Sequence, residues 1–362
     1  MCQGYFVFLQ KITVMKERVA YYDVLNVISC FSVVCLHSNG MIHTFIKDDI
    51  WWLRVLIEVC SFFAVPIFFM LSGATLLSYR TKYSTKQFYR KRFVRTVIPY
   101  LFWSITFYGL YMIEHGACPW KEVINGLTTG LVPYTYYWFF IPLFLIYLFI
   151  PFLALMVNQL NKKNLLILCI LLVILQSIIP TIYLLMGIDI QFQLPIGGFF
   201  TFTLLGYLLS ISDYESNNKC MLWIISLSLT SLIIRYIIIY EAAAKPYGLF
   251  SYFGLYSFLP PIAIFMVIKR KVQHRTVHRI WSFLAKRSFG VYLLHFFIIC
   301  VLRKHIPYTS LLFITFGTII VYFMAVFITY ALQKNRYIRY ILPWFFHLFN
   351  KKRALKFGRF SK

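Results

Sequence analysis

The chain has 362 residues, of which 60% are hydrophobic and only 13% are charged, and its mean hydropathy is +0.73. A soluble globular domain is nearer half apolar and a quarter charged, so this composition excludes an ordinary soluble enzyme. The net charge of +25 comes from 36 Lys and Arg against 11 Asp and Glu. These basic residues stand in short clusters between apolar blocks rather than on one soluble surface, which excludes a nucleic-acid-binding protein.

The apolar blocks predict an all-α, polytopic integral membrane bundle of about ten spanning helices. Each block is close to the roughly 20 residues that cross the hydrocarbon core of a bilayer. We expect the spans at residues 20–38, 53–78, 93–113, 135–157, 164–186, 196–211, 220–240, 249–268, 288–303 and 310–332. The sixth span is short and is preceded by Pro195-Ile196-Gly197-Gly198, so we expect it to be broken or tilted.

Lys and Arg orient these spans. If ten helices alternate and the N-terminus is cytoplasmic, 29 basic residues fall inside, 6 outside and one within a helix. This asymmetry predicts a multi-pass protein of the cell membrane with both termini in the cytoplasm. We expect a cytoplasmic segment at 1–17, a transmembrane domain at 18–333 and a basic cytoplasmic tail at 334–362. The start is open between Met1 and Met15, because the charged run after Met15 leads directly into the first span.

The first span carries polar residues at helical spacing. Asn26 and His37 are eleven residues apart, so they share a helix face and lie about 16 Å apart along the axis. Asp23 extends the same stripe toward the cytoplasmic end. Ionisable residues within a span are costly and mark functional sites. His37 either caps the helix at the outer interface or acts as a general base, and spacing alone leaves both open.

The third span begins with a basic cluster in which Arg92 and Arg95 are three residues apart and on one face. Anchoring at the positive inner surface explains most of this cluster. Arg95 lies nearly a turn further into the membrane, where it needs an anionic partner. Guanidinium groups suit bidentate binding of phosphate, so these two arginines are candidates for an anion site.

Four more ionisable residues lie within expected spans. Arg54 and Glu58 have the spacing of an intrahelical ion pair. Arg235 either extends to the outer interface or holds a ligand. His295 is single in its helix, which is typical of a hydrogen-bonded packing residue. We interpret the aromatic residues near outer helix ends as an interfacial belt rather than as sugar-stacking platforms. They are Trp51, Trp52, Trp120, Tyr134, Tyr136, Tyr137 and Trp138.

Four segments, in this order, resemble the acyltransferase 3 family of membrane acyltransferases. They are Tyr22-Asp23-Val24-Leu25-Asn26 leading to His37, Val65-Pro66-Ile67-Phe68-Phe69-Met70-Leu71-Ser72-Gly73, Lys91-Arg92-Phe93-Val94-Arg95 with Ile98-Pro99-Tyr100, and Ser288-Phe289-Gly290-Val291-Tyr292-Leu293-Leu294-His295. The resemblance covers about residues 18–330. It implies a membrane acyltransferase that moves an acyl group from cytoplasmic acyl-CoA to a hydroxyl of a cell-surface or lipid-linked glycan. The acyl group in this family is usually acetyl.

The resemblance also implies roles for particular residues. His37 matches the family's histidine as the catalytic general base, and Arg92 and Arg95 match its paired arginines as acyl-donor-binding residues. We expect support from three further residues: Asp23, Asn26 and His295. The family usually has an arginine about ten residues before the histidine, where this chain has Asn26. The implied partners are acyl-CoA as donor substrate, a glycan acceptor and membrane lipid, with no bound cofactor or metal.

The main alternative is an exporter of polysaccharide or lipid-linked sugar without acyl-transfer activity. A bundle without a soluble domain suits either function. The sequence shows neither the internal repeat of many transporters nor a G-x-x-x-x-G-K-[ST] nucleotide-binding loop, which disfavours the exporter. Most of the eight Cys lie within apolar blocks and none forms a C-x-x-C pair, so neither a metal site nor a disulfide framework is indicated.

Overall fold

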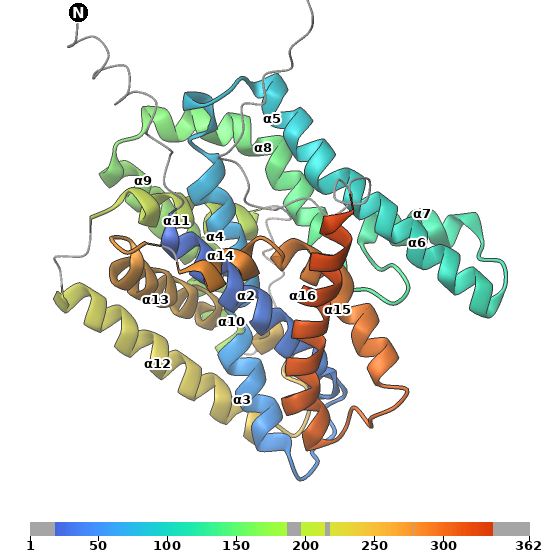
Figure 1. Cartoon of the computed structure of the whole chain (residues 1–362). Coiled ribbons are helices and arrows are strands. Elements are labelled where there is room, and N and C mark those ends of the chain that lie inside the picture. Colours follow the sequence, from blue (N-terminus) through green and yellow to red (C-terminus); the bar gives the residue numbers. More distant parts are fainter. Residues whose placement is uncertain (1–18, 187–196, 214–217, 277, 336–362) are drawn as a thin grey trace, which may run out of the picture.

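A computed structural model describes residues 19–186, 197–213, 218–276 and 278–335, and within these ranges the chain is helical with no strand (Figure 1). Among the described residues, eight helical stretches are long and apolar enough to cross a membrane, and a bent pair of helices makes a ninth if it is one span. The all-α membrane bundle is therefore confirmed. The predicted segment 1–17, the start residue and the tail after residue 335 lie outside the described residues, and the orientation of the termini stays a prediction.

In the first half of the chain, the described residues form seven α-helices. They are α2 (Ala20–Ser38), α3 (Trp51–Ser61), α4 (Ala64–Leu76), α5 (Thr85–Arg92), α6 (Ile98–His115), α7 (Trp120–Thr129) and α8 (Phe140–Gln159). The described part of the second half forms eight. They are α9 (Lys162–Val173), α10 (Ile179–Leu185), α11 (Gly197–Ile211), α12 (Asn218–Glu241), α13 (Leu255–Val272), α14 (Arg279–Ala285), α15 (Ser288–Leu302) and α16 (Thr318–Lys334).

Short π- and 3₁₀-helical segments join several of these helices. The π-helical segments are Phe93–Val97, Ile174–Ile178 and Phe313–Gly317, and the 3₁₀ segments are Gly40–Thr44, Tyr79–Thr81 and Tyr247–Phe250. The first two π segments join α5 to α6 and α9 to α10, so each pair continues as one helical stretch. A π turn inserts a residue into a helix and is frequent at functional sites.

Each of the ten expected spans contains a helix. The expected span 53–78 is confirmed as one candidate span, Trp51–Thr81, in which a turn at Phe62 and Phe63 separates α3 from α4. The continuous apolar run gives no sign of this turn. The stretch 114–134, between the third and fourth expected spans, contains α7, which Pro119 precedes and Gly130 follows. Ten residues are too few to cross a bilayer, so α7 is not a span. The Pro195-Ile196 part of the expected break before the sixth span lies outside the described ranges.

The core is organised around α2 and α4. Figure 1 shows α2 in the middle of the bundle, where it contacts α3, α4, α13, α14, α15 and α16. The backbones of α4 and α11 touch, because a Cβ on Gly73 would lie 1.7 Å from the Thr203 carbonyl oxygen, and one on Gly206 would lie 1.9 Å from that of Met70. Small residues permit such close approach between membrane helices. This contact holds α4, and with it Phe68, firmly against the rest of the bundle.

Candidate active site

The first and the penultimate spans run parallel and in register. Asn26 contacts Ala285, Cys30 contacts Ser288 and His37 contacts His295, at sequence separations of 259, 258 and 258. A constant separation is the mark of two parallel helices side by side. Polar residues on α2 therefore meet polar residues on α15 at matching depths, which the spacing along either helix alone does not reveal.

Two histidines meet at the far end of this helix pair. His37 Nδ1 lies 2.6 Å from His295 Nε2, and the two ring planes are within 10° of each other. The other nitrogen of His295, Nδ1, lies 2.8 Å from the Tyr292 carbonyl oxygen and 3.1 Å from that of Val291. His295 is fully enclosed at 1% exposure. His295 is hydrogen-bonded within its own helix, as expected. Its contact with His37 is a second interaction, which the sequence does not reveal.

These contacts assign the protons on both rings. A carbonyl oxygen only accepts, so His295 Nδ1 carries the hydrogen and its neutral ring has a lone pair on Nε2. That lone pair accepts from His37 Nδ1–H. His37 then keeps its own Nε2 lone pair for a further group. A hydrogen bond to one ring nitrogen commonly sets which nitrogen of a functional histidine carries the proton. The arrangement presents His37 as a base whose basic nitrogen is predetermined.

Residues before α8 hold this end of α15 in place. The Tyr137 hydroxyl donates to the Leu293 carbonyl (2.7 Å), and the Tyr292 hydroxyl donates to the Tyr136 carbonyl (2.9 Å). The Tyr136 ring lies 5.1 Å from the His37 ring. Tyr137 and Trp51 are both buried, so the interfacial-belt interpretation is wrong for these two residues. Trp52 and Trp120 are exposed. The sequence gives no signal of this, because an aromatic residue at a helix end suits both environments.

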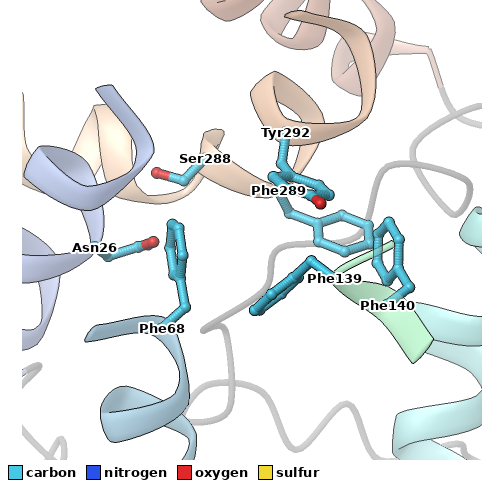
Figure 2. A pocket seen from close by; sticks show the side chains of 7 residues that line it. All are labelled: Asn26, Phe68, Phe139, Phe140, Ser288, Phe289 and Tyr292. Carbon is cyan, nitrogen blue, oxygen red and sulfur yellow. The ribbon is translucent and has the colours of Figure 1, made fainter. Parts of the chain in front are cut away.

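A small, partly open pocket lies between α2, α4, α8 and α15, with about 310 Å³ of empty space when the adjoining open solvent is included. Figure 2 shows Asn26, Ser288 and Phe68 at one side and an aromatic group at the other. The lining residues are Asn26, Phe68, Phe139, Phe140, Ser288, Phe289 and Tyr292. Ligand cavities in proteins are typically apolar with a few placed polar groups, and this one has that composition. Tyr292 joins the cavity to the histidine pair, since its ring lies 5.7 Å from that of His295.

Asn26 is the main polar group at the cavity. Its Nδ2 donates to the Ala285 carbonyl at 3.2 Å, where α14 ends and the chain bends by 61° into α15. Its Oδ1 is buried and has no hydrogen-bond partner among the described residues. An amide in this position ties α2 to the bend and leaves one acceptor facing the cavity. Asp23, on the same stripe one turn earlier, is also buried.

Arg92 is the second unusual group in the bundle interior. Its side chain is 6% exposed, and its guanidinium carbon lies 5.5 Å from the ring centre of Tyr147 and 5.8 Å from that of Phe88. Its Nε and Nη2 are buried without a hydrogen-bond partner in the described part of the chain. An unpaired buried cation is costly, so this position favours an anion. Arg95 follows in the π-helical segment, is half-buried, and is close enough to interact electrostatically with Arg92.

The three features follow one another along the bundle. Tyr147, beside Arg92, and Phe140, in the cavity wall, are seven residues apart on α8, or about 10 Å along the axis. Phe144 lies between them, with its ring 5.7 Å from that of Phe140. Beyond the cavity come Tyr292 and then the histidines. The cavity lining itself includes neither the arginines nor His37 and His295.

The remaining charged residues depart from their expected pairing. Arg54 forms a bidentate ion pair with Asp48 (2.7 Å), and Glu58 lies 3.8 Å from Arg235, so the expected Arg54–Glu58 pair is wrong. Arg235 is 1% exposed and does not extend to an interface. Asp48 precedes α3 and Arg235 belongs to α12, and spacing within one helix cannot reveal partners from elsewhere in the chain.

These observations define a polytopic membrane protein with a histidine pair, an aromatic cavity and a buried arginine aligned through its core. Residues 19–332 match the acyltransferase domain of the acyltransferase 3 family. The chain belongs to this family and is a membrane-embedded acyl-transfer enzyme, as the sequence predicted, rather than the alternative exporter. No curated protein and no solved structure matches the chain.

Proposed function

We propose that the enzyme transfers an acyl group, which is usually acetyl in this family, from cytoplasmic acyl-CoA to a hydroxyl of a cell-surface or lipid-linked glycan. The observation that carries this proposal is the histidine pair, in which His295 leaves His37 Nε2 as the free basic nitrogen. The acceptor class comes from the family resemblance. General-base catalysis by a positioned histidine is the ordinary way to activate a hydroxyl at neutral pH.

In the proposed reaction, His37 Nε2 takes the proton of the acceptor hydroxyl while the hydroxyl oxygen attacks the thioester carbonyl carbon. The carbon–sulfur bond then breaks, and the CoA thiolate leaves and receives the proton from His37. His295 touches none of the reacting atoms and acts as a positioning residue, since its only role is to hold the His37 tautomer and ring orientation. Asp23 and Asn26 line the α2 face along which the donor extends.

Arg92 and Arg95 bind the phosphates of acyl-CoA in this scheme. The Nε and Nη2 groups of Arg92, which have no hydrogen-bond partner among the described residues, support that role, because phosphate oxygens accept charge-assisted hydrogen bonds from guanidinium. The excess of basic residues at the same end of the bundle supports a cytoplasmic location for the donor. The thiol arm and acyl group then occupy the aromatic cavity, between the arginines and the histidines.

The cavity predicts a limit on the acyl chain, with Phe68 as part of its wall. We expect Phe68→Ala to raise the kcat/KM for hexanoyl-CoA relative to acetyl-CoA by about tenfold or more, because each extra methylene placed in an apolar site contributes 1–3 kcal/mol of discrimination. Competition between the two donors on purified protein measures this ratio. Phe202→Ala is the control, since Phe202 is also buried but lies outside the cavity lining. An unchanged donor ratio in folded Phe68→Ala protein contradicts the acyl assignment.

The tautomer argument predicts graded effects at His295. We expect His295→Ala to lower kcat by roughly 10–100-fold, as is usual when a group that orients a functional histidine is lost. His295→Gln should retain much more activity, because its amide oxygen can still accept from His37 Nδ1–H. Single-turnover kinetics on both variants measure this difference. Equal losses in the two variants, with native thermal stability, show that His295 does not act through a hydrogen bond to His37.

A direct experiment tests the proposed function as a whole. Surface glycans are extracted from cells with and without the gene, and their O-acyl content is compared. Purified protein in nanodiscs is then given radiolabelled acetyl-CoA and the glycan from the deletion strain. We expect the O-acyl groups to be lost on deletion and labelled glycan to form in vitro. Identical O-acyl content in both strains, with no transfer in vitro, overturns the proposal.

A further inference from the structure

Glu58 and Arg235 form a buried pair that the proposed reaction does not use. We propose that this pair and the aromatic rings around it form the acceptor subsite, which binds an uncharged, hydroxyl-rich ring of the sugar class. The inference rests on the proposed function, because it requires an acceptor that approaches His37. It assigns residues and a charge preference to acceptor binding, neither of which follows from the family.

Several polar atoms of the pair lack a hydrogen-bond partner among the described residues. Arg235 Nη2 lies 3.8 Å from Glu58 Oε1, and both side chains are 1% exposed. Arg235 Nε donates to the Leu249 carbonyl at 3.0 Å, but Nη1, Nη2 and Glu58 Oε2 have no hydrogen-bond partner among the residues described. Buried ionic groups normally complete their hydrogen bonds. A hydroxyl group both donates and accepts, so one sugar hydroxyl between the two side chains satisfies both.

Aromatic rings enclose the pair. The Arg235 guanidinium carbon lies 4.0 Å from the Phe62 ring centre and 4.5 Å from that of Tyr256. The Phe62 ring stacks on Tyr252 at 4.4 Å, and Tyr252 lies 5.6 Å from Trp138. Flat apolar faces next to a few convergent polar groups are typical of small-molecule sites. Because the charges of Glu58 and Arg235 cancel, the pair favours a neutral ring over an anionic one.

The pair lies level with the catalytic histidine. Asn39 Nδ2 donates to the Arg54 carbonyl at 2.8 Å, and Cys35 contacts Ser61, so α2 and α3 run antiparallel. His37 and Glu58 are therefore at similar depths in the bundle, with His37 on the opposite face of α2, which is turned toward α15. The segment before α8 joins the two places, since Tyr136 contacts His37 and Trp138 contacts Tyr252. One short segment thus contacts both the His37 ring and an aromatic ring close to the ion pair.

The test separates acceptor binding from donor binding. Glu58→Gln, which is nearly isosteric, and Arg235→Lys, which keeps the charge but loses the guanidinium, are assayed in nanodiscs with radiolabelled acetyl-CoA and the glycan extracted from the deletion strain. We expect the KM for glycan to rise about tenfold or more, as is typical when one hydrogen bond to a charged group is lost. The KM for acetyl-CoA and the glycan-independent hydrolysis of acetyl-CoA should not change. Arg54→Lys is the matched control, because Arg54 is equally buried but is bidentate with Asp48.

A competition assay tests the charge preference. Octyl β-D-glucoside should inhibit transfer to the glycan by wild-type protein at least tenfold more strongly than octyl β-D-glucuronide, and Arg235→Lys should reduce that difference. An unchanged glycan KM in both variants, or equal loss of glycan and donor binding, overturns the subsite and leaves a structural ion pair. Absence of any transfer by wild-type protein instead overturns the proposed function, so the two failures are distinguishable.

Discussion

His37→Ala is expected to abolish nearly all acyl transfer while the protein remains folded in the membrane. General-base catalysis by a positioned side chain contributes about 10²–10⁴-fold, so kcat should fall within that range. The measurement is transfer of labelled acetyl from acetyl-CoA, together with CoA thiol release. Donor binding should persist, because His37 lies beyond the cavity from Arg92. A loss of rate with an unchanged KM for acetyl-CoA is the signature of a group that acts only in the chemical step.

Two controls guard this interpretation. His115→Ala removes an exposed histidine at the end of α6 and should leave transfer unchanged. His37→Gln keeps a polar side chain of similar size, so its protein should resemble the wild type in yield and thermal stability. A His37→Gln protein with wild-type kcat refutes the role of His37 as the base. It leaves the family membership of the chain untouched.

Arg92→Met is expected to have opposite effects on binding and on stability. Each charge-assisted hydrogen bond to phosphate contributes about 1.5–3 kcal/mol, so the KM for acetyl-CoA should rise by roughly 10–150-fold. The protein without donor should become more thermally stable, because a buried guanidinium with two unfilled positions is replaced by an apolar side chain of similar length. Isothermal titration with CoA and a thermal unfolding scan measure the two effects.

Arg90→Met supplies the comparison for this second prediction. Arg90 lies on the same helix and is exposed, so its substitution should change neither donor binding nor stability appreciably. If Arg92→Met lowers stability and leaves CoA affinity intact, Arg92 is a structural residue and the donor phosphates bind elsewhere. Arg95→Ala should weaken donor binding less than Arg92→Met, since Arg95 is only half-buried.

The sequence was informative where a property belongs to a single helix. The spans follow from apolar blocks that only a bilayer accommodates, and the stripe from Asp23 to His37 follows from helical periodicity. The sequence does not predict contacts between segments that are far apart in the chain. Nothing near Glu58 points to Arg235, and nothing near His37 points to His295, because tertiary contacts have no local signature. The break at Phe62 was missed for a related reason, since its neighbours are apolar on both sides.

Asn26 shows how a departure from a family pattern acquires meaning only from contacts. On the sequence, it is a neutral residue where the family usually carries a cation. In the structure, its amide donates to the last carbonyl of α14, at the bend that begins α15. A hydrogen-bond donor is retained at this position and the positive charge is not, so Arg92 and Arg95 are the cationic pair that we propose for binding of acyl-CoA.

The parallel register of α2 and α15 has a consequence for how the enzyme is made. The two histidines are 258 residues apart in the chain, so the first is inserted into the membrane long before the second exists. A chain that ends before α15 lacks the ring that accepts from His37 Nδ1–H, so this hydrogen bond forms only when synthesis of the membrane domain is nearly complete.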